Sequence, residues 1–286
     1  MSGDDALLWG RPRLVEEHDR RGQATRMTGG VTALILTRNE APNIARTLGR
    51  LAWVSEIVIV DSQSTDDTRE IATGFPNVRV FEHAFTSHAE QWNYGLMETG
   101  IVSEWVLALD ADFVLTPEIV AELKQLEPSA GVCGYQASFD YCINGKPLRG
   151  AAYPPVVVLY RRDGARYAQD GHTQRVVVPG TVLPLAGRIL HDDRKPLGQW
   201  LSAQIRYMRL EAEKLTSDPQ ASLGALDRVR RMVVVAPPAM FVYCYFVRGG
   251  ILDGAAGLFY ALQRAAAELL LSLYLVERMV MRESRD

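Results

Sequence analysis

The sequence predicts an α/β protein built on a doubly wound, mostly parallel sheet. Four short apolar runs, rich in valine, isoleucine and leucine, alternate with helix-like segments within the first ~130 residues. Polar side chains gather directly after three of these runs. Because ligands of doubly wound sheets bind beyond the carboxyl ends of the strands, the same pattern also predicts where a site lies.

Each expected strand has the length and composition of a buried parallel strand. These strands cover residues 31–37, 56–60, 78–81 and 105–115. The segments between them carry helix-starting residues and apolar residues at a spacing of three to four. Four helices are expected. The first begins at Pro42, with Asn39 or Glu40 near the cap, and the second begins at Thr65 or Asp66 and runs to Thr73. The third runs from Ser87 to Thr99, and the fourth begins at Thr116-Pro117.

The run over 105–115 contains two carboxylates one residue apart, Asp110 and Asp112. A strand places residues i and i+2 on the same face, so both side chains are expected to project together from a strand end beside a turn. Such a pair is costly to bury unless a cation neutralises it, and Mg²⁺ or Mn²⁺ prefers oxygen ligands of this kind. The alternative for a D-x-D sequence taken alone is a solvated loop.

After residue 127 the pattern changes to longer mixed strands over 132–143 and 155–162, with Asn144-Gly145 as a turn between them. A polar loop over 167–175 follows, and then a polar segment over 189–196. Both segments gather carboxylates, imidazoles and guanidinium groups. We interpret them as candidate acceptor-side and catalytic elements.

The last ~85 residues show the apolar periodicity of helices. Residues 232–247 carry no charge, are interrupted by Pro237-Pro238 and are flanked by arginines. This stretch is shorter than the about 20 apolar residues that a membrane-spanning helix needs. It predicts a helix-break-helix that lies in the interface of an anionic membrane. The alternatives are a buried hairpin or a contact with a second copy of the chain, which would make a homo-oligomer.

Composition narrows the classes of function. The 286 residues are 48% hydrophobic and 23% charged, as in a soluble globular protein. The formal net charge of −3 gives no basic field, so no nucleic-acid partner is expected. The three cysteines lack metal-binding spacing and the N-terminus lacks the apolar core of a secretory signal, so we expect a reducing, cytoplasmic location.

The expected organisation has three parts. Residues 1–28 form a flexible N-terminal tail, residues 29–198 form the α/β domain, and residues 199–286 form a C-terminal helical region with the expected membrane attachment.

Seven motifs, in order over about residues 31–260, resemble those of inverting family-2 glycosyltransferases of the GT-A fold. They are L-T-R-N-E, D-S-Q-S-T-D-D-T, Q-W-N-Y-G-L, L-D-A-D, D-G-H-T-Q-R, H-D-D-R-K-P and R-G-G-I-L-D-G-A-A-G-L. Within the family, the chain is most similar to the bacterial branch that includes lipopolysaccharide core β-glucosyltransferases. The resemblance implies transfer of a hexosyl group, such as glucose from UDP-glucose, to a lipid-linked or lipopolysaccharide acceptor at the inner face of the cytoplasmic membrane.

The resemblance also implies roles for individual residues. The residues implied to bind the nucleotide sugar are Thr37, Asn39, Glu40, Asp61, Ser62, Ser64, Asn93, Asp110, Ala111 and Arg175. Asp110 and Asp112 are implied to bind Mg²⁺ or Mn²⁺, which as a Lewis acid stabilises the departing diphosphate. His191 is a further candidate ligand of the metal or the phosphates, with a structural role as the alternative.

Inversion requires a general base that takes the acceptor's proton. Asp170 is the first candidate, and His172 and Asp192 are alternatives. The chain departs from the branch in two places: His172 is followed by Thr-Gln where a His-Glu pair is expected, and Trp92 stands where related chains often carry Lys or Arg.

Two other functions remain to be weighed. A sugar-phosphate nucleotidyltransferase also uses a nucleotide-binding sheet and Mg²⁺, but it would normally carry a glycine-rich loop after the first strand, where this chain has Thr37-Arg38-Asn39-Glu40. A non-catalytic scaffold would not need the carboxylates Asp61, Asp110 and Asp112.

Overall fold

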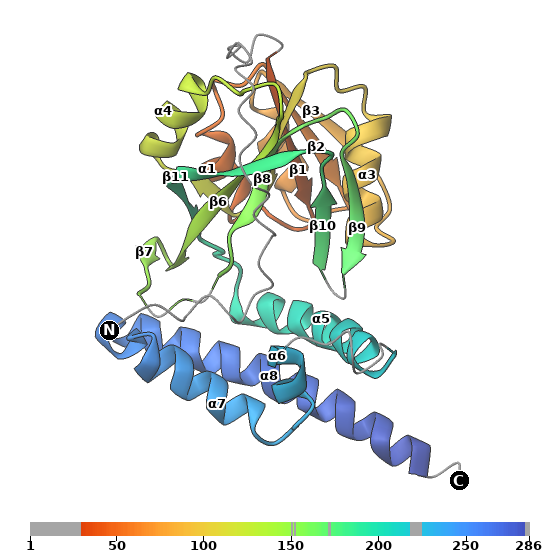
Figure 1. Ribbon diagram of the computed structural model, residues 1–286, viewed down its shortest axis with the longest axis vertical. Helices are drawn as coiled ribbons and strands as arrows, with labels where there is room; N and C mark the ends of the chain where they lie inside the picture. Colours follow the sequence, from red (N-terminus) through yellow and green to blue (C-terminus); the bar gives the residue numbers. More distant parts are fainter. Residues whose placement is uncertain (1–29, 150, 152, 171–172, 218–224, 284–286) are drawn as a thin grey trace. The chain divides into compact units, whose positions relative to one another are not determined.

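The computed structural model describes residues 30–149, 151, 153–170, 173–217 and 225–283 (Figure 1). The expected tail over 1–28 lies outside these residues. Contacts divide the chain into two compact units. The sheet unit contains the described residues up to Pro147 together with Tyr153–Lys195, and the helical unit contains Leu148–Ala152 and the residues from Pro196 onward.

Within the described residues, nine strands form the main sheet, in the order β3-β2-β1-β4-β8-β6-β11-β5, with β7 paired to β6. A separate antiparallel hairpin joins β9 and β10. The strands are β1 (Val31–Thr37), β2 (Glu56–Asp61), β3 (Val78–Glu82), β4 (Trp105–Asp110), β5 (Phe113–Leu115), β6 (Val132–Ile143), β7 (Lys146–Pro147), β8 (Val156–Arg161), β9 (Arg166–Asp170), β10 (Thr173–Val177) and β11 (Thr181–His191).

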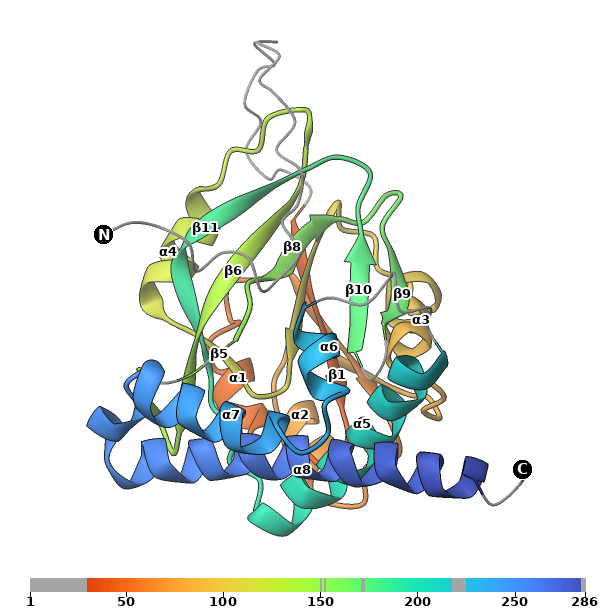
Figure 2. The ribbon, with the colours of Figure 1, turned by 60° about the horizontal axis from the view of Figure 1, so that its bottom comes forward.

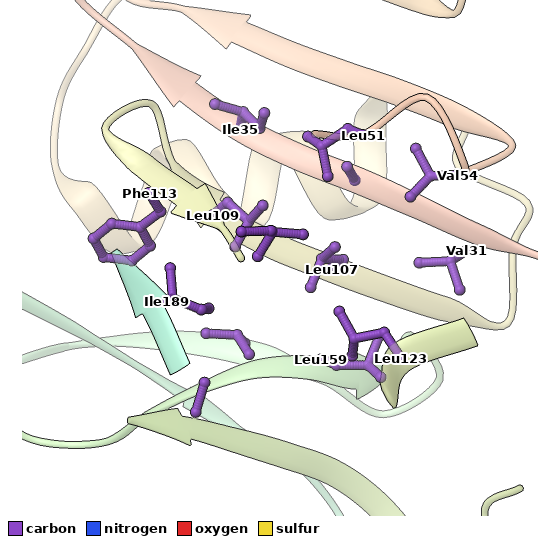
Figure 3. Packing of buried hydrophobic residues seen from close by; sticks show 14 of the residues in the cluster. Val31, Ile35, Leu51, Val54, Leu107, Leu109, Phe113, Leu123, Leu159 and Ile189 are labelled. Carbon is purple, nitrogen blue, oxygen red and sulfur yellow. The ribbon is translucent and has the colours of Figure 1, made fainter. Parts of the chain in front are cut away.

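Helices cover both faces of the parallel half of the sheet, where β3, β2, β1 and β4 run in the same direction. These helices are α1 (Ile44–Leu48), α2 (Thr68–Thr73), α3 (His88–Glu98) and α4 (Pro117–Gln125). Successive strand residues point to opposite faces, so Ala33 and Ile35 join the core under α1, α2 and α4, whereas Leu34 packs with α3. Figure 3 shows the first of these cores around Ile35, Leu107 and Leu109. The predicted doubly wound, mostly parallel α/β sheet is confirmed.

Several local expectations need correction. The run over 105–115 is two strands: β4 ends at Asp110, the chain turns through Ala111 and Asp112, and β5 pairs with β11. The turn is possible because Thr47 of α1 donates to the Ala111 carbonyl at 2.7 Å. Helix α1 follows Asn43 at its cap instead of Asn39 or Glu40, and α2 follows Asp67.

Two further corrections concern the second half of the sheet unit. Asn144 and Gly145, with φ values of 50° and 79°, form the turn between β6 and the short strand β7, so the turn does not lead directly into β8. The polar loop over 167–175 belongs largely to the β9–β10 hairpin. Strand formation here satisfies backbone groups that a loop would leave to water.

The helical unit contains α5 (Leu197–Ser217), α6 (Ala225–Arg230), α7 (Ala236–Val242) and α8 (Ala255–Glu283), as Figure 2 shows. Residues Tyr243–Val247 extend α7 as a π-helical turn, and Gly250–Asp253 form a 3₁₀ turn. Pro237 and Pro238 lie in the first turn of α7. They begin a helix, where proline needs no N–H partner, instead of breaking one as expected.

The glycines of the R-G-G-I-L-D-G-A-A-G-L motif allow the backbone at Gly250 to approach the first turn of α8 closely. A Cβ atom on Gly257 would lie 1.9 Å from the carbonyl oxygen of Gly250, so only glycine permits this contact. Among the described helices, α8 alone is long and apolar enough to cross a membrane by length and composition, over Ala255–Met281, and 39% of an 18-residue apolar window of that segment is buried.

Candidate active site

The polar residues predicted to share a site meet at the carboxyl ends of β1, β2 and β4. The strand order reverses between β1 and β4, which is where doubly wound sheets bind ligands. In the registers of these strands, Thr37 lies beside Asp61 and Leu36 lies beside Asp110. The expected grouping of the three strand ends is therefore present in the fold.

Asp61 fixes the two loops that follow β1 and β2. The fully buried carboxylate accepts hydrogen bonds from Thr37 Oγ1 at 2.7 Å, Ser64 Oγ at 2.6 Å and Ser64 N at 2.8 Å. Asn39 N donates to Ser64 Oγ, and Asn39 Oδ1 accepts from Thr65 N, both at 2.8 Å. Asn39 adopts a left-handed conformation, with φ of 54°, which asparagine tolerates better than most residues. Three of about four acceptor positions of the Asp61 carboxylate are thus taken by the protein.

Glu40 belongs to a buried charge cluster. Lys195 Nζ contacts Glu40 Oε1, and Asn43 Nδ2 donates to Glu40 Oε2 at 2.9 Å. Burial raises the pKa of Glu40 to about 7, with Lys195 opposing and Asp112 adding to the shift. Burial alone would lower the pKa of Lys195, but the carboxylates of Glu40, Asp193 and Asp112 raise it. Lys195 is therefore a fixed cation among these carboxylates.

Asp110 and Asp112 differ in their surroundings. Burial and the charge of Asp112 raise the pKa of Asp110 to about 6. Burial would raise the pKa of Asp112 as well, but His191 holds it below its usual value, with His191 Nε2 3.1 Å from Asp112 Oδ2. Burial opposes the charged form of His191, yet Asp112 and Asp110 raise its pKa. Two carboxylates in this setting fit a divalent cation, which would neutralise them.

The donor set for such a cation is small. In the described part of the chain, no group of three or more His, Cys, Asp or Glu side chains has the arrangement of a metal site. Mg²⁺ and Mn²⁺ need no complete protein cage, since they commonly take one or two carboxylates and fill their shell with water and phosphate oxygens. The ring of His191 is flanked by Phe113, Tyr141 and Tyr153, with centroids 4.8–5.1 Å away.

The H-D-D-R-K-P segment is tied to α1 by residues that sequence reasoning missed. Asp192 accepts from Arg46 Nη1 at 2.6 Å, from Arg194 Nε at 2.9 Å and from Gly145 N at 2.8 Å. Its own N–H donates to the carbonyl of Asp112 at 3.1 Å. Both oxygens of this buried carboxylate are therefore occupied, and Asp192 links the segment to the D-x-D turn.

Asn43 completes this link. Its side chain is buried, accepts from Arg46 Nη2 and Arg194 N, and donates to Glu40 and Asp193. The signal that could have found Asn43 and Arg46 is their spacing of three on α1, which places them on one face at the start of the helix.

On the far side of the parallel strands, α3 holds the β9–β10 hairpin. Asn93 Nδ2 donates to the Tyr167 carbonyl at 2.9 Å and Asn93 Oδ1 accepts from Tyr167 N at 2.8 Å. Ser62 accepts from Gln91 Nε2 at 3.0 Å. The Asn93 amide is thus engaged with the backbone, and Ser62 with α3.

Of the other predicted residues, three lie in the described chain and one lies outside it. Ala111 faces the core and Arg175 lies exposed on β10 opposite Ala168. Asp170 is the last residue of β9, paired with Thr173, and His172 lies outside the described residues.

Comparison with known proteins decides the family. The profile described as glycosyl transferase family 2 matches residues 32–174. An uncharacterized glycosyltransferase of Rickettsia conorii is 32% identical over 238 residues, which cover 78% of this chain and 83% of the relative. The chain belongs to glycosyl transferase family 2. It is therefore a glycosyltransferase, and its sheet unit has the GT-A fold that the motifs implied.

Other proteins are similar to this family-2 glycosyltransferase along most of its length. The lipopolysaccharide core biosynthesis glycosyltransferase LpsC of Rhizobium meliloti is 27% identical over 261 residues, covering 82% of this chain and 90% of LpsC. Among solved structures, S. aureus TarS 1-349 in complex with UDP-GlcNAc is 14% identical, covers 88% of this chain and 92% of its own, and has a TM-score of 0.41.

A second structure is the glucosyl-3-phosphoglycerate synthase of Mycobacterium tuberculosis in complex with Mn²⁺, UDP and phosphoglyceric acid. It is 15% identical, covers 69% of this chain and 82% of its own, with a TM-score of 0.44. The family-2 match ends before His191, so the H-D-D-R-K-P segment of this glycosyltransferase lies beyond the matched residues.

Proposed function

We propose that this glycosyltransferase moves a hexosyl group from a UDP-sugar to a lipid-linked or lipopolysaccharide acceptor, with inversion and with the aid of Mg²⁺ or Mn²⁺. The observation that carries the proposal is the acidic cluster of Glu40, Asp110 and Asp112 at the switch point of the sheet, in which Asp112 is buried and the other two are partly buried. Lys195 and His191 do not suffice to make this acidic cluster favourable for a diphosphate, so a bound cation is needed as well.

The loops after β1 and β2 supply the nucleoside side of this site. Asp61 retains about one acceptor position after its three internal bonds, which suits a single N–H donor such as the uracil imide. Thr37 and Ser64 orient that carboxylate, and Asn39 and Thr65 hold the loop around it. Donor recognition through Asp61 thus relies on a carboxylate that cannot rotate away.

The diphosphate side is formed by Asp110 and Asp112, which would hold the divalent cation. When bound, this cation supplies Lewis-acid stabilisation of the leaving diphosphate. His191 orients Asp112 through its hydrogen bond, and the Asp192 N–H fixes the carbonyl of Asp112. Both contacts reduce the freedom of the second carboxylate, as supporting groups do around metal ligands.

For the general base, Asp170 remains our first choice. Asn93 fixes the hairpin that carries Asp170 to α3, through two bonds to Tyr167. Asp192 is less suited to be the base, because its two carboxylate oxygens already accept hydrogen bonds from Arg46, Arg194 and the Gly145 N–H. We assign Asp192 and Asn93 to positioning: Asp192 holds the D-x-D turn and Asn93 holds the hairpin.

The acceptor class is inferred from sequence similarity to LpsC, whose name gives a role in lipopolysaccharide core biosynthesis. A cytoplasmic location fits the three cysteines, which are free thiols in the structure. Work at the inner face of the cytoplasmic membrane would bring a soluble UDP-sugar and a lipid-borne acceptor together.

A donor screen by thermal unfolding tests the proposal. UDP-glucose and other UDP-sugars, each with Mn²⁺, should raise the unfolding temperature of the protein, because a ligand at about 100 times its Kd stabilises the folded state by about 2.7 kcal/mol. The D61N variant should lose this shift and keep its own fold. Equal stabilisation by UDP-sugars and by GDP- or CMP-sugars, or a D61N variant that binds normally, would contradict the assignment.

A further inference from the structure

Two buried glutamates of the helical unit pair with one arginine. Arg230 donates from Nε and Nη2 to Glu268, at 2.8–3.2 Å, and from Nη1 to Glu211 at 3.2 Å. Glu268 is 1% exposed and Glu211 is 4% exposed. Ser272, one turn beyond Glu268 on α8, donates to the Val233 carbonyl at 2.6 Å. The buried side of α8 therefore carries polar residues that are paired with α5, α6 and the segment before α7.

The opposite side of α8 is apolar and exposed. Its residues follow one another at intervals of three, four or seven, so they lie on a single face of the helix. They are Leu258, Leu262, Leu269, Leu273, Val276 and Val280, and they are 39–58% exposed. At 1.5 Å per residue, this outer stripe runs about 33 Å along the helix. Figure 2 shows α8 as one uninterrupted helix.

The end of α7 adds a second apolar group, next to cations. Val242, Phe246 and Val247 are 48–69% exposed. Arg248, which follows them, is also exposed, as is Arg228 on α6. Apolar side chains at the surface next to arginines suit an interface that is apolar on one side and anionic on the other.

The inner side of α8 also has an apolar core around Leu271 and Leu275, so α8 is apolar on both sides, whereas a helix in water normally exposes a polar side. Exposed apolar residues scattered singly need no explanation, but a continuous stripe indicates a contact surface. Charged residues that face inward and pair with one another, behind an apolar exterior, are typical of protein that faces lipid. We propose that the outer stripe of α8 and the end of α7 lie in the headgroup interface of an anionic lipid bilayer.

The proposed orientation is parallel to the membrane plane. A helix that crosses a bilayer is apolar on all sides unless its neighbours cover it, whereas α8 carries the paired Glu268 and the polar Ser272 on the side that packs against Met208 and Leu215 of α5. The Arg228 and Arg248 side chains would meet anionic headgroups. The inference concerns a surface and does not depend on the donor or the acceptor.

Vesicle binding by the full chain tests this surface. We expect the protein to co-sediment with vesicles of phosphatidylcholine and phosphatidylglycerol in equal amounts, and to bind pure phosphatidylcholine vesicles more weakly. The L269E/L273E variant should lower the partition coefficient at least about tenfold, because it removes two apolar contacts and adds repelled charges. The neutral variant L269S/L273S should lower it by a smaller factor.

The matched control is M97E/V102E, which places the same two charges at exposed apolar positions of the sheet unit, where Met97 is 61% and Val102 is 87% exposed. It should bind vesicles as the wild type does, and all variants should keep their unfolding temperatures. Equal binding by L269E/L273E and M97E/V102E would overturn the proposal.

Two other results would also overturn it. In the first, the wild type does not bind vesicles but forms a dimer in solution, and L269E/L273E dissociates this dimer. That result would assign the stripe to a second copy of the chain. Resistance of the bound protein to extraction with alkaline carbonate would show that α8 crosses the bilayer. Donor binding measured on the same variants in solution separates these outcomes from failure of the proposed function.

Discussion

His191 Nε2 lies 3.1 Å from Asp112 Oδ2, so the last residue of β11 contacts the second carboxylate of the D-x-D turn across 79 positions of sequence. Three aromatic rings pack against the imidazole of His191, which limits the orientations that it can adopt. Asp112 is therefore oriented before any ligand arrives.

The first prediction concerns this contact. The H191F variant should weaken Mn²⁺ binding by about ten- to hundredfold, since groups that orient metal ligands typically contribute that much. The H191Q variant, whose amide can donate to Asp112, should recover most of the affinity. Electron paramagnetic resonance titration of free Mn²⁺ measures both. If H191Q binds as poorly as H191F, His191 is itself a metal ligand.

The second prediction concerns pH. The folded-state pKa of Glu40, raised by burial to about 7, exceeds its ordinary value of 4.5. The folded state therefore binds more protons than the unfolded state between these values, and the stability contributed by Glu40 falls as pH rises through this window. In metal-free protein, the stability of E40Q relative to the wild type should rise from pH 5 to pH 8. Urea unfolding at each pH gives this difference, and a flat or falling difference would refute the assignment.

The third prediction concerns Asn43. The N43A variant removes four hydrogen bonds and leaves Glu40, Asp193 and the Arg46 guanidinium partly unpaired, so the free energy of unfolding should fall by about 2–4 kcal/mol. The matched control is N77A, because the side-chain amide of Asn77 makes two long bonds of 3.4–3.5 Å. It should cost less than about 1 kcal/mol. Equal losses in the two variants would argue against a central role for Asn43.

The fourth prediction separates donor binding from transfer. Both polar atoms of the Asn93 amide bind the Tyr167 backbone. The N93A variant should therefore keep the UDP affinity within about threefold. Its transfer rate should fall at least about tenfold, because the hairpin that carries Asp170 loses a contact that holds it to α3. Calorimetry with UDP and a transfer assay give the two values. A loss of UDP affinity as large as the loss of transfer would return Asn93 to the donor site.

Local sequence patterns were sufficient to predict several of the helices and strands. Local chemistry predicts the bounds of β1 and β6, the cap of α4 at Thr116 and the start of α3 at Ser87, and the structure has them as expected. The grouping of Asp61 with Asp110 also followed, since parallel strands place their carboxyl ends at one edge.

What local patterns could not give are the contacts between distant segments. Arg46 and Asp192 are 146 residues apart, and nothing near either residue indicates the other. The break between β4 and β5 was missed because the residues on both sides of Asp110 and Asp112 are apolar, and the contact of Thr47 of α1 with the turn is not visible in the local sequence. The β9–β10 hairpin is polar in sequence, and its pairing depends on contacts of Asn93 with Tyr167.

In the proposed function, Asp112 holds a catalytic cation for a UDP-sugar. UDP release measured with and without Mn²⁺ tests this role. The wild type should release UDP only with Mn²⁺ or Mg²⁺, and D112N should lose at least about a hundredfold in rate while its unfolding temperature changes little. The control D140N alters a partly exposed aspartate that pairs with Arg188, and this variant should turn over normally. Metal-independent turnover, or a D112N variant with a near-normal rate, would contradict the account.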